Sequence, residues 1–123
     1  MIQLGISAEK KLFLQGGSAF AGDKGTTATI SLPTYFGGVA IGEFDEGNIY
    51  IKYGSDYAEI ALEGLTGNQD IDIPDEALAE SGFITIWGEF TADSGAVVQK
   101  TSLLQFAVGA SETYVAPQSG GGD

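Results

Sequence analysis

The sequence predicts a small antiparallel β-sandwich with one short helical turn. Three observations support this fold class. Apolar and polar residues alternate in runs of a few residues, each run is bounded by Gly, Asp or Pro, and 19 glycines but only 3 prolines are spread over 123 residues. A chain of this length buries about two-thirds of its surface and supports one core. Residues 1–115 are therefore expected to form one domain, and residues 116–123 a flexible glycine-rich tail.

The first half of the chain contains several strand-like runs separated by turn residues. Alternation or short apolar stretches mark residues 2–7, 12–14, 26–32 and 39–44. Each run is too short for a helix and ends at or near a glycine, proline or charged residue. These runs favour strands connected by tight turns.

A β-hairpin is the clearest local pattern. Residues 49–53 and 56–63 are rich in Ile, Tyr and Ala, and they flank Gly54-Ser55. A two-residue connection with Gly first is typical of a type II′ turn. Because strand side chains alternate, the odd-numbered residues of the first arm share one face and Tyr50 lies on the other.

One helical turn is expected after the hairpin. Residues 74–80 begin with Pro, carry acids in the first turn and are followed by Gly82. Such a turn is too short to be stable alone, so Leu78 is expected to pin it to the sandwich. Residues 83–90 then resume as a strand with Trp87 on the face opposite Ile86, and residues 97–108 predict one last long strand.

Composition excludes several classes of function. The chain has 17 acidic residues, 5 lysines, no Arg, no His and no Cys, for a net charge of −12. No basic patch can form, so neither nucleic acid nor an anionic membrane is an expected partner. Without imidazole, thiol or guanidinium groups, we expect no enzyme and no cofactor.

Four carboxylates lie within seven residues, at Asp70, Asp72, Asp75 and Glu76. Such oxygen ligands suit calcium, but the spacing lacks the Asp-x-Asp-x-Asp-Gly loop with a distal Glu. Strand alternation and the first turn of the helix already account for these residues. No metal site is predicted, and calcium binding stays open.

Four aromatic residues, Tyr50, Tyr53, Tyr57 and Trp87, could form a platform that stacks sugars or partner side chains. Aromatic residues also favour strands for packing reasons. Since the hairpin tyrosines alternate faces, we expect at most half of the four on one surface. Packing in the core or in cross-strand pairs is the favoured interpretation.

The stretch from residue 39 to 114 resembles a domain found at the start of virion proteins of phages that infect Gram-positive bacteria, including head-fibre, baseplate-upper and other tail proteins. The resemblance rests on the order of elements: a Phe-Asp-Glu-Gly segment at 44–47, the hairpin at 49–62, the Ile-Pro-helix-Gly segment at 73–82, and the strands at 83–88 and 99–108.

This resemblance implies an immunoglobulin-like sandwich that acts as a non-enzymatic capsid-decoration or fibre-anchoring subunit on the particle surface. Its partners would be other virion proteins, such as the major capsid or tail protein, together with further copies of the chain. Two alternatives remain open: a carbohydrate- or ligand-binding module that uses the aromatic hairpin, and a cell-surface or secreted structural domain.

Contact with a partner is expected to come largely from the terminal segments, residues 1–15 and 110–123, because they lie outside the recognisable sandwich pattern. The candidate interaction residues are Ile2, Leu4, Ile6, Tyr50, Tyr57 and Tyr114.

Overall fold

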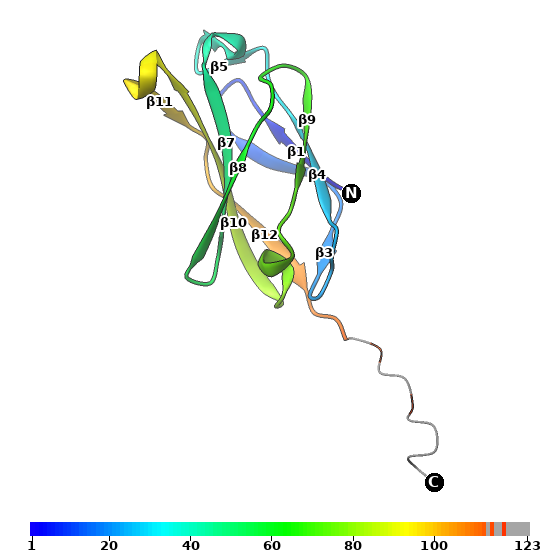
Figure 1. Cartoon of the computed structure of the whole chain (residues 1–123). Coiled ribbons are helices and arrows are strands. Elements are labelled where there is room, and N and C mark those ends of the chain that lie inside the picture. Colours follow the sequence, from blue (N-terminus) through cyan, green and yellow to red (C-terminus); the bar gives the residue numbers. More distant parts are fainter. Residues whose placement is uncertain (113, 115–116, 118–123) are drawn as a thin grey trace.

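The computed structural model describes residues 1–112, 114 and 117, and it confirms an all-β sandwich-like fold (Figure 1). Its helical elements are short 3₁₀ turns, η1 (Ile41–Glu43), η2 (Asp75–Leu78) and η3 (Asp93–Gly95). The strands are β1 (Ile2–Ile6), β2 (Leu12–Gly16), β3 (Ala19–Phe20), β4 (Thr27–Ser31), β5 (Tyr35–Phe36), β6 (Val39–Ala40), β7 (Glu46–Tyr53), β8 (Asp56–Ala61), β9 (Asn68–Asp72), β10 (Gly82–Ala92), β11 (Val97–Lys100) and β12 (Leu104–Gly109).

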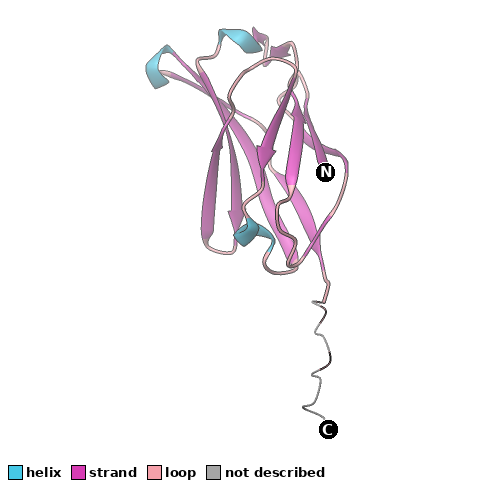
Figure 2. Cartoon of the chain, turned by 45° about the vertical axis from the view of Figure 1, so that its right-hand side comes forward, coloured by secondary structure: helices cyan, strands magenta, loops and turns pink. Residues whose placement is uncertain are grey.

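Two sheets form the layers of the sandwich. The four-stranded sheet has the order β2-β1-β4-β9, and the six-stranded sheet has the order β3-β12-β10-β7-β8 with β11 also paired to β10. The ladders are antiparallel except that β1 runs parallel to β4 and β12 runs parallel to β3. Figure 2 shows η2 at the end of the sandwich from which the C-terminal segment leaves, whereas η1 and η3 lie at the opposite end.

The core lies between the two sheets. Leu4 and Ile30 project from one sheet and Ile49 and Ile86 from the other, and each is at most 1% exposed. Phe90 closes one end of this core as part of an aromatic cluster with the rings of β5 and the η1 segment. Alternation along β10 follows the predicted faces, because its even-numbered residues from 84 to 90 are buried.

The N-terminal segment is part of the sandwich, which corrects the prediction for residues 1–15. β1 is an inner strand of its sheet, antiparallel to β2 and parallel to β4. The side chains of Ile2, Leu4 and Ile6 are therefore 2%, 0% and 4% exposed. They are core residues and cannot reach a partner while the domain stays folded.

The predicted hairpin is confirmed with its register. Tyr53 pairs with Asp56 across the Gly54-Ser55 connection, and Gly54 has a φ of +61°. A left-handed φ at the first central residue is what a type II′ turn requires, and glycine adopts it without steric cost.

The predicted helical turn exists as the 3₁₀ turn η2 rather than as an α-helix. Leu78 is fully buried, and its carbonyl oxygen accepts a hydrogen bond of 2.8 Å from the Gly22 N–H. This bond ties η2 to the segment that follows β3. The expectation that Leu78 pins the turn to the sandwich is confirmed. None of the helical elements in the described part of the chain is long and apolar enough to span a membrane.

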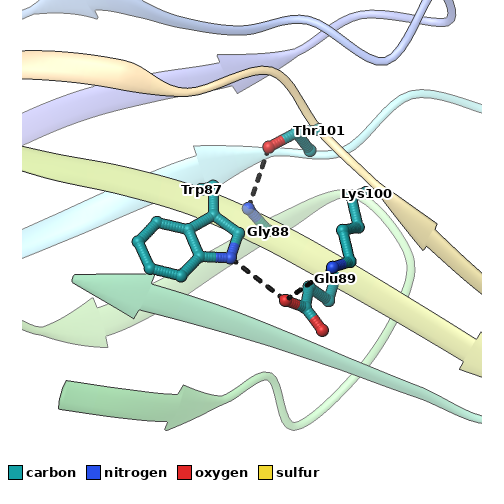
Figure 3. A network of polar contacts seen from close by, with 5 residues as sticks. All are labelled: Trp87, Gly88, Glu89, Lys100 and Thr101. Carbon is teal, nitrogen blue, oxygen red and sulfur yellow. Dashed lines mark hydrogen bonds and ion pairs between the residues drawn. The ribbon is translucent and has the colours of Figure 1, made fainter. Parts of the chain in front are cut away.

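The predicted single strand over 97–108 is wrong, because the chain breaks between β11 and β12. At the break the Thr101 N–H donates to the Gly88 carbonyl oxygen at 2.9 Å. The Gly88 N–H donates to Thr101 Oγ1 at 2.8 Å (Figure 3). The Thr101 hydroxyl in turn donates to the Ser102 carbonyl oxygen at 2.9 Å. The Thr101 side-chain oxygen thus accepts the hydrogen bond that a backbone carbonyl of a neighbouring strand would otherwise accept from Gly88.

Candidate functional site

An aromatic cluster lies on the outer face of the six-stranded sheet, the face turned away from the four-stranded sheet. Tyr50 on β7, Tyr57 on β8 and Trp87 on β10 share this face, and we call them the aromatic platform. Tyr53 is the exception, since it packs against the core. Three of the four aromatic residues therefore share one surface, and the prediction of at most half was wrong.

The rings of the platform touch one another in two arrangements. Tyr50 is the direct cross-strand partner of Trp87, and their rings are nearly parallel, with centroids 5.6 Å apart and an angle of 19°. Tyr57 meets Trp87 edge-on, at 6.4 Å and 86°. The predicted cross-strand pairing is thus present, but it occurs on an open surface where Tyr57 is 62% exposed.

Polar contacts hold the platform in place. The Trp87 Nε1–H donates to Glu89 Oε2 at 3.1 Å, and the Lys100 ammonium lies 3.9 Å from the same oxygen (Figure 3). The Lys52 ammonium lies 5.7 Å from the centre of the Tyr57 ring. The indole is therefore fixed through its nitrogen.

Carboxylates give the platform a negative surround. Partial burial, a hydrogen bond to Glu59 and the negative charges of Glu59, Glu89 and Glu46, in that order, raise the pKa of Tyr50 to about 12. Each of these effects favours the neutral phenol. Tyr50 therefore keeps its proton at any physiological pH.

A second exposed surface lies at the end of the sandwich where β12 finishes. Phe20 and Phe83 flank this strand and are 47% and 69% exposed. Phe83 is paired with Ala107, while the Phe20 ring lies beside Gly109, where an added Cβ would come within 2.7 Å of it. We call Phe20, Phe83 and Ala107 the end surface.

A cleft of about 580 Å³ adjoins the end surface. It opens between the tip of the β7–β8 hairpin and η2, with Phe83 on its border. Its acidic lining residues are Asp56, Glu76 and Glu80. A partner group that enters this cleft meets the Phe83 ring and negative charge together.

The remaining candidates are Tyr114 and the acidic residues at 70–76. Tyr114 is 81% exposed, and the tail beyond it lies outside the described residues except for Pro117. Asp70 accepts a hydrogen bond from the Thr29 hydroxyl at 2.8 Å, and Asp75 accepts one from the Gly25 N–H at 3.1 Å. Within the described ranges, no group of three or more acidic side chains is placed to hold a metal ion.

The groups gathered at the platform are suited to binding. Flat ring faces stack ligands, carboxylates accept hydrogen bonds, and the ammonium of Lys52 donates them. A comparison with protein-family models and with curated proteins found no match to this chain.

Proposed function

We propose that this chain is a non-enzymatic virion structural protein, a capsid-decoration or fibre-anchoring subunit that attaches to the particle through its end surface. The resemblance of residues 39–114 to the phage domain supports the class of protein. The single observation that supports the mode of attachment is the exposure of Phe20 and Phe83 on either side of β12. Exposed aromatic rings around one strand offer apolar area to a contact surface.

The two rings offer a useful amount of apolar area. At their exposed fractions they present roughly 200 Å², because a phenylalanine buries 150–250 Å² when fully covered. Burial of that area stabilises a complex by about 5 kcal/mol before the costs of association. These rings alone account for a weak contact, and a firm attachment needs further area around them.

The negative charge of the chain indicates which kind of particle surface it can bind. With a net charge of −12, copies of the chain repel one another at low salt. Acidic residues also line the cleft beside Phe83. The acceptor on the particle is therefore expected to carry basic side chains, and attachment should weaken as salt screens the attraction.

Co-sedimentation with purified particles that lack the subunit tests this proposal. A Phe20→Ser/Phe83→Ser double variant should sediment at least tenfold less than the wild type. Leu14→Ser is the matched control, because Leu14 is 44% exposed but lies on the four-stranded sheet. Wild-type binding by a double variant that still melts cooperatively would refute attachment through the end surface.

A second candidate function is the binding of carbohydrate or another small ligand at the aromatic hairpin. The gathering of Tyr50, Tyr57 and Trp87 on one open face favours it.

A further inference from the structure

We infer that the aromatic platform is a binding site for an uncharged pyranose saccharide. This inference rests on the second candidate function and is independent of attachment through the end surface. It identifies the class of ligand from three properties of the platform: its exposed aromatic surface, its fixed geometry and the sign of its surrounding charge.

The ring faces supply the stacking surface. Tyr57 is 62% exposed, and the partly exposed Tyr50 and Trp87 rings stack against each other beside it. The C–H groups on one face of a pyranose carry partial positive charge from the neighbouring oxygens. The negative face of an aromatic ring attracts such groups, and a sugar ring can therefore lie flat against it.

The site is already organised before a ligand arrives. Glu89 holds the indole through its nitrogen, and Tyr50 stacks on that indole with Glu59 as its cross-strand partner. Rings that are fixed in this way lose little conformational entropy on binding. The same two carboxylates have further lone pairs, which can accept hydrogen bonds from the hydroxyl groups of a sugar lying on the rings.

The surrounding charge selects among saccharides. Glu46, Glu59 and Glu89 approach Tyr50 closely enough to raise its pKa. Lys52 lies against the Tyr57 ring and Lys100 lies 3.9 Å from Glu89, so the carboxylates around the platform outnumber the ammonium groups. A uronic acid, a sialic acid or a phosphorylated sugar would be repelled, and a nucleotide would be repelled for the same reason. An uncharged sugar has no such penalty.

Intrinsic fluorescence can test this site directly, because Trp87 is the only tryptophan in the chain. We would titrate the full chain with three neutral probes, tri-N-acetylchitotriose, cellotriose and maltotriose, and with trigalacturonic acid as the anionic probe. An open platform with few contacts should give at least one saturable change with a neutral probe, with a dissociation constant on the order of 1 mM. Trigalacturonic acid should produce none.

Matched variants test whether the saccharide binds to the platform or elsewhere on the surface. Tyr57→Ala should weaken the responding neutral probe at least fivefold. Tyr35→Ala should leave it unchanged, since Tyr35 is similarly exposed (56% against 62%) but lies on the separate β5–β6 sheet. Glu59→Gln removes a negative charge and should therefore give a larger fluorescence response to trigalacturonic acid than the wild type, in which no response is expected. Saturation-transfer NMR with Trp87→Ala provides a readout that does not need the indole, and the transfer should be lost.

Three results would overturn the inference: no saturable response to any neutral probe at about ten times the expected dissociation constant, equal responses to the neutral and anionic probes, or unchanged binding by Tyr57→Ala. The Phe20→Ser/Phe83→Ser variant should bind the saccharide as the wild type does. Failure here would therefore leave the particle-attachment proposal standing, and failure of attachment would leave this site standing.

Discussion

Replacement of Thr101 by valine should destabilise the domain although the two side chains have nearly the same shape. Thr101 is 7% exposed, and its hydroxyl oxygen is the acceptor for the buried Gly88 N–H at the break between β11 and β12. Valine retains the volume but offers no acceptor. The Gly88 N–H would lose its partner in a place that water does not reach.

The size of the effect follows from that lost partner. An unsatisfied buried donor costs about 1–3 kcal/mol. For 123 residues the entropy of unfolding is about 0.26 kcal/mol per kelvin, so a loss of 2 kcal/mol lowers the melting temperature by about 8 °C. Thr101→Ser keeps the acceptor and removes one methyl group, and it should cost only about 1 kcal/mol.

Urea denaturation followed by circular dichroism measures both variants. The Gly88 amide should also exchange with solvent faster in Thr101→Val than in Thr101→Ser. Thr29→Val is the control for a threonine hydroxyl that bonds a side chain on the surface. If Thr101→Val remains within about 0.5 kcal/mol of the wild type, or is no less stable than Thr101→Ser, the hydroxyl does not replace the missing strand partner.

Three further predictions concern the six-stranded sheet. Trp87→Ala should cost about 1–2 kcal/mol rather than the 3–5 kcal/mol typical of a core aromatic residue, because the indole lies on the outer face; a thermal-unfolding loss above 3 kcal/mol would contradict this placement. Gly54→Val should cost about 1–2 kcal/mol through its positive φ alone, since an added Cβ would meet no atom within 4 Å; wild-type stability in urea would argue against the strained turn. Tyr50 should ionise with a pKa of about 12, against 10.0 in the unfolded chain, so its contribution to stability is complete below pH 10 and is lost between pH 10 and 12. The difference in tyrosinate absorbance between the wild type and Tyr50→Phe should therefore have its midpoint near pH 12, and a midpoint near pH 10 would contradict the burial and hydrogen bond of the phenol.

The shared face of the aromatic platform could have been predicted from the sequence. A two-residue turn at Gly54-Ser55 pairs residue 53 with residue 56, which places Tyr57 on the same face as the even-numbered residues of β7. Tyr50 is one of these. Ile84 and Ile86 identify the buried face of β10, so Trp87 had to lie on the outer face. The prediction of at most two aromatic residues on one face was wrong because it did not apply the hairpin register to the residues of β8.

The role of the N-terminal segment was harder to predict. β1 pairs in parallel with β4, a strand more than twenty residues further along the chain. Parallel neighbours need a long connection, and alternation within each strand does not reveal which strands become neighbours. The alternation over residues 2–7 did predict a strand, and the error was to expect the side chains of this strand to contact a partner.

The break at Thr101 could not be predicted from local sequence patterns either. Residues 97–108 contain enough Val, Leu and Phe to suggest one continuous strand. The two halves pair with different parts of β10, because Lys100 lies opposite Glu89 and Leu104 lies opposite Ile86. Residues 101–103 therefore lie opposite only two residues of β10, 87 and 88. The backbone pairing is interrupted there, and the Thr101 hydroxyl oxygen accepts the hydrogen bond of the Gly88 N–H.

The two proposed surfaces lie close enough to constrain each other. Phe83 and Trp87 are four residues apart on the same face of β10, a separation of about 13 Å. A standard protein interface covers about 800 Å² on each partner, which corresponds to a circle of about 16 Å radius. A partner centred on Phe83 would therefore cover the Trp87 indole. A partner centred on the cleft beyond Phe83 would leave the indole accessible to a saccharide. Because the cleft offers both the Phe83 ring and acidic side chains to a basic partner, we expect the second arrangement. Saturating saccharide should then leave co-sedimentation with particles unchanged, and competition between the two would instead place the particle contact over the sheet face.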